Sequence, residues 1–255
     1  MGSPEPAVAS TSKQQHLTRL IALVVLLVFW QMASLTVQRP ILPPPTSVLS
    51  ALVQDLPQTL GRHFAASLYR VVTSIALAII LAAPAGLLLG QSRRLSRLFA
   101  PFIYLLYPIP KVVLVPMVLL LLGVGDLPKI VLITMILFFQ ILVLVRDAAA
   151  SIRPELLISV RSLGAGRRAL FRFVYFPASL PAILTALRQS IGTAIAVLYI
   201  AELFATRYGL GYYIYLQGST LFDYPRMYAG IVTMSILGFG LYTVVDTTAQ
   251  QLCRW

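Results

Sequence analysis

The residues that could carry chemistry are few and are scattered along the chain. Neither a Gly-x-x-x-x-Gly-Lys-Ser/Thr phosphate loop nor a His-Glu-x-x-His, Gly-x-Ser-x-Gly or Cys-x-x-Cys motif occurs in the sequence. His16 and His63 are isolated and lack the spacing of metal ligands, and Cys253 is the single cysteine. We therefore expect no catalytic residue, no metal and no cofactor in this chain. Any energy from ATP must be supplied by a separate chain.

A few charged residues lie inside or at the ends of long apolar segments. Arg70, Arg188 and Glu202 are in such places, where a charge costs about 2.5–3.5 kcal/mol on insertion scales and so normally has a partner. For Glu202 two interpretations stay open: a salt bridge, for instance with Arg70 or Arg207, or a role in gating or substrate passage. We expect Arg188 to be an interface anchor and Asp246 to be solvated.

Three prolines interrupt one apolar segment. Pro108, Pro110 and Pro116 remove backbone hydrogen bonds and predict a break in that helix. Broken helices at membrane depth are tolerated where they are buried in protein or line a water-filled cavity, so this segment is the best candidate for lining a pathway. Lys111 beside the break could attract an anionic substrate, or could snorkel to the membrane interface.

The composition identifies the elements that must position these residues. The chain has 255 residues, of which 58% are hydrophobic and 11% charged, with a mean hydropathy of +0.86, whereas about a quarter of the residues of a soluble domain are charged. We predict an all-α integral membrane protein of about six transmembrane helices, the fourth being short. The expected spans are 17–35, 67–90, 99–122, 130–145, 181–204 and 228–245. Small residues in the second span favour close helix packing over pathway lining.

The net charge of +12 is explained by topology, and we do not expect nucleic-acid binding. In the six-span arrangement twelve basic residues lie on one side and five on the other, which places the first group and both termini in the cytoplasm by the positive-inside rule. The first group is Lys13, Arg19, Arg93, Arg94, Arg97, Arg146, Arg153, Arg161, Arg167, Arg168, Arg172 and Arg254. The second is Arg39, Arg62, Lys129, Arg207 and Arg226.

Outside the spans, we expect a disordered cytoplasmic tail over 1–16 and a single membrane domain over 17–255. The segment 47–60 has apolar residues at helical spacing and is expected to be an external helix on the membrane surface that ends at Gly61. The external loop 207–214 combines two glycines with aromatic residues that suit the membrane interface.

The basic loop 149–178 is predicted to be folded. Pro154 and Glu155 suit the first turn of a helix, and Gly164 supplies its stop. The apolar residues expected on one face of this helix are Leu156, Leu157, Val160 and Leu163. A second basic piece follows over 167–173, and Pro177 and Pro181 are expected to end helical structure before the next span.

At this point a family resemblance is visible. The residues that carry it are Gly164-Ala165, Val174-Tyr175-Phe176-Pro177, Leu187-Arg188, Gly192 and Ala201-Glu202. Their spacing resembles the EAA signature of ABC-importer permeases, which implies a type I importer permease fold whose cytoplasmic helix docks in a groove of a separate ATPase. The coupling residues that the resemblance implies are Glu155, Arg161, Ser162, Gly164, Ala165, Phe171 and Pro177. Ile158-Ser159-Val160 stands where the signature has Glu-Ala-Ala, so the contact of that glutamate is missing or is supplied by a neighbour such as Glu155.

Two further strings narrow the resemblance. Pro44-Pro45-Thr46 before the external helix, and Pro108-Ile109-Pro110 with Gly123-Val124-Gly125, are similar to the nitrate/sulfonate/taurine branch. The branch implies a small anionic substrate, an external substrate-binding protein, cytoplasmic ATPase subunits and the bacterial inner membrane. It also implies a second permease, either another copy of this chain, as a homodimer, or a close relative. The external loop 207–214 could receive the binding protein or be an interfacial belt alone. Candidate pathway residues are Pro108, Pro110, Lys111, Arg70 and Glu202.

Two other classes of protein were weighed against a transport subunit. A membrane-embedded lipid-modifying enzyme should cluster acidic, His or Ser groups at one depth, and the few acidic residues here are scattered. A membrane scaffold would not need a span broken by prolines. The sequence therefore favours a non-catalytic transport subunit.

Overall fold

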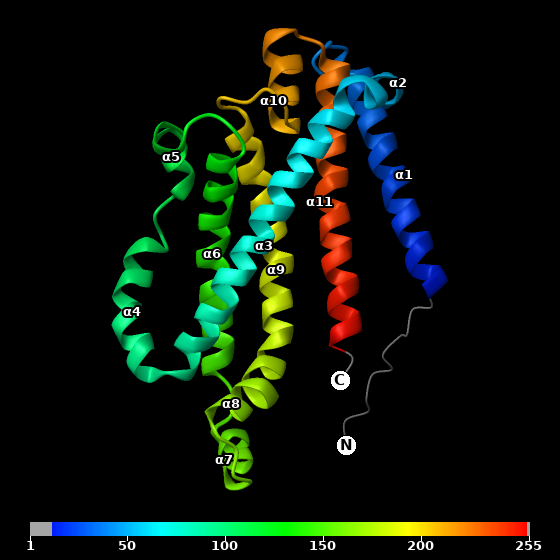
Figure 1. The fold of residues 1–255 in the computed structure, drawn as a ribbon. Coiled ribbons are helices and arrows are strands. Elements are labelled where there is room, and N and C mark those ends of the chain that lie inside the picture. Colours follow the sequence, from blue (N-terminus) through cyan, green and yellow to red (C-terminus); the bar gives the residue numbers. More distant parts are fainter. Residues whose placement is uncertain (1–11, 254–255) are drawn as a thin grey trace.

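A computed structural model of the chain describes residues 12–253, and every regular element in that range is a helix (Figure 1). The α-helices are α1 (Ser12–Val37), α2 (Pro45–Asp55), α3 (Gly61–Gln91), α4 (Arg93–Leu106), α5 (Val115–Leu122), α6 (Leu127–Ala150), α7 (Pro154–Ser162), α8 (Arg167–Leu170), α9 (Phe176–Glu202), α10 (Leu210–Tyr215) and α11 (Tyr224–Leu252). A 3-10 turn occupies Lys111–Leu114, and wider π turns occupy Leu56–Leu60, Phe171–Tyr175 and Leu216–Thr220.

Five of the described helices are long and apolar enough to cross a membrane, and a bent pair can form a sixth crossing. The five helices are α1, α3, α6, α9 and α11. The bent pair consists of Arg93–Leu106 and Lys111–Leu122, which meet at 74°. The expected break in the third span is confirmed, because the chain turns where the prolines stand. The fourth span was wrongly expected to be short, since α6 has 24 residues. Its extra turns carry Lys129 and Arg146, whose charges are paired or hydrogen-bonded and so do not end the helix.

The core of the bundle is formed where α3 crosses α6 and α9 (Figure 1). Val71, Leu137 and Leu198 are fully buried there. Glycines set the closeness of the contact between α3 and α6. A Cβ on Gly90 would lie 2.5 Å from Ala149 Cβ, and one on Gly86 would lie 2.9 Å from Leu142 O. Close helix packing, rather than pathway lining, is therefore the role of these two small residues.

The first helix is peripheral and is attached mainly at one end. Its side chains are exposed over most of the length of α1, as suits a helix in contact with lipid. Trp30 Nε1 donates to Pro43 O at 3.1 Å and Ser34 Oγ donates to Leu42 O at 2.9 Å. The helix begins at Ser12, ahead of the expected start at residue 17. The remaining part of the expected disordered tail, 1–11, lies outside the described residues.

The helix expected over 47–60 is present but does not end at Gly61. α2 passes through the π turn Leu56–Leu60 into α3, and Gly61 keeps a helical φ of −61°. A glycine ends a helix when it takes a positive φ, which Gly61 does not. The helix is also not free on a surface, because Val48 and Ala51 are buried against Ala229 of α11.

The prolines at the start of the fifth span likewise do not end the helix. Pro177 lies in the first turn of α9. The N–H groups of a first turn have no acceptor within the helix, so the N–H that proline lacks costs no hydrogen bond there. The preceding π turn closes with Phe176 N–H donating to Phe171 O, so the ladder passes the proline without a gap. Pro181 lies on an exposed side within α9. The loop 149–178 is thus a chain of helical segments joined to the span.

The packing of α3 on α6 gives a first testable prediction. Gly90→Val should lower the melting temperature of the detergent-solubilised protein, because the new side chain meets Ala149 and overpacking typically costs about 1–3 kcal/mol. Gly240→Val is the matched control, since a Cβ on Gly240 of α11 meets nothing within 4 Å. Similar melting temperatures for the two variants would contradict the close α3–α6 contact.

Candidate functional site

The coupling residues implied by the sequence gather at one end of the molecule, where α7 and α8 extend beyond the bundle (Figure 1). Glu155, Arg161, Ser162 and Gly164 are exposed. The half-buried members are Ala165, Phe171 and Pro177, which follow α7 and lead into α9. Glu155 lies in the first turn of α7 and Arg161 in its last, where their charges complement the helix dipole.

α7 is fastened to the rest of the chain by one side only. Leu157 and Val160 pack with Ile152 against a cluster formed by Leu170, Val174 and Tyr175. The other apolar residues of the segment point outward. Leu156 is 46% exposed, Ile158 64% and Leu163 85%. Of the four apolar residues expected on one face of this helix, Leu157 and Val160 make this contact, whereas Leu156 and Leu163, which follows the last residue of α7, are exposed.

Gly164 has the backbone conformation that its position after a helix suggested. Its φ is +83°, in the left-handed region, and its N–H donates to Arg161 O at 2.9 Å. The space around its Cα is open, so a side chain there would be opposed by the backbone conformation and not by a clash. The stop predicted at Gly164 is confirmed.

A buried charge cluster lies in the half of the bundle opposite α7. Glu202, at the end of α9, is fully buried and accepts hydrogen bonds from three residues on two other elements. Its Oε1 receives Arg70 Nη1 at 2.6 Å and Ser67 Oγ at 2.8 Å, both from α3. Its Oε2 receives the Gly211 N–H of α10 at 2.9 Å. An ionised carboxylate without water needs such partners, and Glu202 has them.

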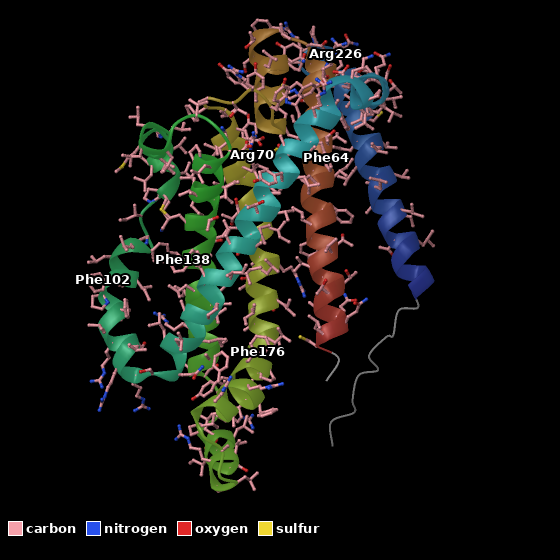
Figure 2. All side chains as sticks on the ribbon, viewed as in Figure 1. Phe64, Arg70, Phe102, Phe138, Phe176 and Arg226 are labelled. Atoms are coloured by element: carbon pink, nitrogen blue, oxygen red, sulfur yellow. The ribbon has the colours of Figure 1, made fainter. Side chains whose placement is uncertain are left out.

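Arg70, which is labelled in Figure 2, is shared between two carboxylates. Besides Glu202 it binds Asp126 Oδ1, at 2.6 Å from Nη2 and 2.7 Å from Nε. The salt bridge considered for Glu202 is therefore made with Arg70. Arg207, the other partner considered, forms no hydrogen bond or ion pair with any residue in the range 12–253.

Two glycines of the loop 207–214 make room for this cluster. A Cβ on Gly209 would lie 2.5 Å from Glu202 Cδ, and one on Gly211 would lie 2.6 Å from Tyr199 O. His63 Nδ1 accepts the Gly209 N–H at 3.0 Å, and Leu210 N–H donates to Ser67 Oγ at 2.8 Å. The loop 207–214 therefore has a packing role in addition to its aromatic surface.

Several members of the cluster were not found from the sequence. These are Ser67, His63, Asp126, Lys129, Gly209 and Gly211. One available signal was the spacing of Ser67, Arg70 and Ser74, which places three polar residues on one face of an apolar helix. The residues from other helices had no comparable signal, because their proximity depends on how the helices pack.

Lys111 does not join the charge cluster in the described structure. It is 9% exposed, and its Nζ donates to Leu106 O at 2.8 Å and to Tyr107 O at 3.1 Å. The amino group also lies 4.5 Å from the centre of the Phe139 ring. Pro108 and Pro110, by contrast, are exposed. Lys111 thus binds carbonyl groups that the broken helix leaves free, and it does not snorkel.

A further ion pair corrects two expectations for the end of the bundle near α7. Arg188 Nη1 lies 3.2 Å from Asp246 Oδ1, and both side chains are about one-third exposed or less. Asp246 is therefore not simply solvated, and Arg188 is more than an interface anchor. The reason is that α9 and α11 pack side by side and bring the two charges together.

The end of the bundle opposite α7 has a second polar cluster, centred on Asp55. The Tyr213 hydroxyl and Arg226 Nε both donate to its carboxylate. Burial, together with this hydrogen bond, raises the pKa of Tyr213, so the phenol stays a proton donor. The cluster ties α2, α10 and α11 together.

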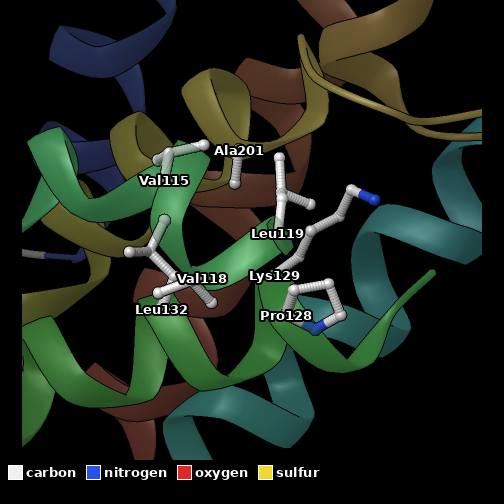
Figure 3. A pocket seen from close by; sticks show the side chains of 7 residues that line it. All are labelled: Val115, Val118, Leu119, Pro128, Lys129, Leu132 and Ala201. Atoms are coloured by element: carbon white, nitrogen blue, oxygen red, sulfur yellow. The ribbon is translucent and has the colours of Figure 1, made fainter. Parts of the chain in front are cut away.

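The small pocket between α5, α6 and α9 is not a ligand site (Figure 3). Its volume is about 10 Å³, which is close to the minimum for one water molecule. Figure 3 shows the aliphatic part of Lys129 along its edge, with the amino nitrogen directed away from it. In the described residues no group of three His, Cys, Asp or Glu side chains is placed to hold a metal.

The helical bundle, with five apolar helices and a bent pair long enough to cross a membrane, defines a multi-pass membrane protein. The family described as the binding-protein-dependent transport system inner membrane component matches residues 74–252, and the chain belongs to this family. The taurine transport system permease protein TauC of Escherichia coli (strain K12) is 32% identical over 96% of this chain and 91% of its own length. A probable ABC transporter permease protein of Brucella melitensis biotype 1 is 32% identical over 84% of this chain and 87% of its own length.

The fold is also that of a solved importer. The MetNI methionine ABC transporter in an inward-facing conformation matches with a TM-score of 0.68 at 21% identity, over 76% of this chain and 95% of the matched chain. The chain therefore has the type I ABC importer permease fold.

Family membership decides between a transport subunit, a lipid-modifying enzyme and a membrane scaffold. The chain is the permease subunit of an ABC importer of the inner membrane, and it is not an enzyme. ATP hydrolysis takes place on a separate ATPase subunit, and a substrate-binding protein is the other partner that the family implies. A lipid-modifying enzyme or a scaffold has no support.

The buried cluster gives a second prediction. Arg70→Met should lower the melting temperature on the order of 10 °C, because removing one partner of a buried ion pair costs about 3–5 kcal/mol. Arg146→Met is the control, since Arg146 pairs with Asp147 at a more exposed site where about 0–1 kcal/mol is expected. Equal thermal stability of the two variants would rule out a stabilising role for the cluster.

Proposed function

We propose that this chain carries a small sulfonate or a related small anion, that 149–178 couples it to the ATPase, and that two copies form the pathway. The taurine permease, which resembles this chain over nearly its whole length, supports the substrate class. The sequence strings similar to the nitrate/sulfonate/taurine branch support it independently.

The observation that carries the coupling proposal is the outward face of α7. Ile158 and Leu163 are large apolar side chains on a helix that projects beyond the bundle, while Leu157 and Val160 hold its other side. Exposed apolar groups of this kind mark contact sites for another protein. A groove of about 860 Å³ beside α7, lined in part by Arg153, Glu155 and Ser159, adds polar surface to the contact. Ile158 would contribute apolar area where the family signature has a glutamate.

The pathway proposal rests on the bent pair α4 and α5. Pro108 and Pro110 are exposed at the bend, and a cavity of about 500 Å³ lies beside Tyr107, Pro108 and Val143. Irregular backbone at membrane depth is tolerated where it lines a cavity. Tyr104 is 81% exposed and Leu120 is 87% exposed, so this side has apolar surface for a second copy to cover. Arg70 and Glu202 contribute through the cluster that holds α3 to α9.

The orientation proposal follows from charge. The basic residues of 93–97, 146 and 153–172 lie at the end where α7 projects, and α1 begins and α11 ends toward that same end (Figure 1). By the positive-inside rule that end faces the cytoplasm, where an ATPase subunit is available to α7. Both termini are then cytoplasmic.

The coupling proposal is tested by co-purification with the ATPase encoded beside this chain. The double variant Ile158→Ser and Leu163→Ser should lose most of the bound ATPase in mild detergent, because it removes the exposed apolar contact of α7. Leu49→Ser is the control. Leu49 is 61% exposed on α2, at the opposite end of the molecule.

Two outcomes would count against this proposal. One is a double variant that retains as much ATPase as the wild type. The other is a wild-type chain that carries no ATPase even when all its partners are co-expressed.

A further prediction concerns the shape of the loop. Gly164→Val should abolish substrate-stimulated ATP hydrolysis while the spans stay folded, because a β-branched residue strongly resists the positive φ of this position. Gly166→Val is the control, since Gly166 has equally open surroundings but no positive φ. The measurement is ATPase activity of the reconstituted complex with the binding protein present. Normal stimulation in the Gly164 variant would refute the role of this turn.

A further inference from the structure

A polar cavity of about 440 Å³ lies beside the Glu202 cluster, at the end of the bundle opposite α7. Its walls come from α3, from the connection between α5 and α6, and from the connection between α9 and α10. The charged residues that line it are Arg70, Asp126, Lys129 and Arg207. Cavities of a few hundred cubic ångströms with a few converging polar groups are typical of small-molecule sites.

Two cationic groups of the wall have unused hydrogen-bonding capacity. Arg207 is exposed and its guanidinium binds no residue of the described part of the chain. Lys129 Nζ donates to Gly125 O at 2.7 Å and to Ala205 O at 3.2 Å. An ammonium group has three donors, so Lys129 retains one. Both side chains line the cavity, where Arg207 is exposed and Lys129 is buried at 1% exposure in its wall.

The wall also offers one free hydrogen-bond acceptor, which carries negative charge. Asp126 uses Oδ1 for both of its bonds to Arg70, and no described residue donates to its Oδ2. The Asp126 side chain is 50% exposed. The site has three cations, Arg70, Lys129 and Arg207, and two carboxylates if Glu202 behind the wall is counted. Its net charge is therefore positive, with the unpaired negative oxygen at Asp126 Oδ2.

We propose that this cavity binds a small zwitterion. Lys129 and Arg207 bind its anionic group, such as a sulfonate, and Asp126 Oδ2 binds its ammonium group. A simple cation is disfavoured by the positive balance, and a simple anion would leave Asp126 Oδ2 without a partner and be repelled by it. The inference rests on the proposed function, because the cavity would be a receiving site in the permease for the molecule that the binding protein releases.

The test measures binding to the purified permease–ATPase complex without the binding protein, by isothermal titration calorimetry. The probes are taurine, which carries a sulfonate and an ammonium group, and ethanesulfonate, which carries the sulfonate alone. Taurine should bind saturably and about tenfold more tightly than ethanesulfonate, because only taurine pairs with Asp126.

Variants assign the two ends of the probe. Arg207→Gln should weaken taurine binding by about tenfold, since it removes one charge-assisted contact and disturbs no existing bond. Arg62→Gln is the matched control, because Arg62 is an exposed cation of α3 that does not line the cavity. Asp126→Asn, which keeps an acceptor for Arg70, should remove the preference for taurine over ethanesulfonate.

Three results would overturn the proposed site: no saturable taurine binding to the wild-type complex, equal affinities of the Arg207 and Arg62 variants, or equal affinities for the two probes. Failure of the proposed function is distinguishable, because it would appear as a chain that binds no ATPase. If the complex forms, and the binding protein stimulates its ATP hydrolysis while no probe saturates, the cavity proposal fails and the function stands.

Discussion

The charge of Glu202 is the constraint on which the arrangement of the bundle depends. A carboxylate without solvent contact is tolerated only if its charge and its lone pairs are matched. Ser67 and Arg70 reach it from α3, and Gly211 reaches it from α10, so three elements must meet at one point. The close approach in turn requires that residues 209 and 211 have no Cβ. One buried group therefore fixes both the crossing of α3 on α9 and the path of the loop 207–214.

The same constraint acts on backbone groups that proline or a bend leaves without a helical partner. At the bend between α4 and α5, Lys111 supplies donors to carbonyls of residues 106, 107 and 109, and thereby allows a 74° change of direction. At the start of α9, the π turn carries the hydrogen-bond ladder past Pro177. Irregular backbone occurs in this fold where a specific substitute partner exists, as the absence of water inside a bilayer requires.

The two ends of the molecule differ in how firmly they are held, and α9 joins them. At one end Asp55, Tyr213 and Arg226 add a second cluster of polar contacts to that of Glu202. At the other end α7 is attached by a small apolar cluster that includes Tyr175, the residue before α9 begins. α9 has 27 residues and so spans about 40 Å. α9 thus connects the end of the molecule that carries α7 to the end that carries Glu202 (Figure 2, with Phe176 near the start of α9).

Local and compositional features were fixed by the sequence itself. Long apolar runs predicted the spans, three prolines predicted the bend, and Pro154, Glu155 and Gly164 predicted the bounds of α7, because each depends on length, backbone geometry or capping within a few residues. Tertiary structure decided what depends on neighbours. Gly61 and Pro181 continue helices instead of ending them, Asp246 pairs with Arg188, and Lys111 binds carbonyls at the bend. The partners of Arg70 come from residues 126 and 202, and no sequence spacing could select them, because helix crossing alone brings such distant charges together.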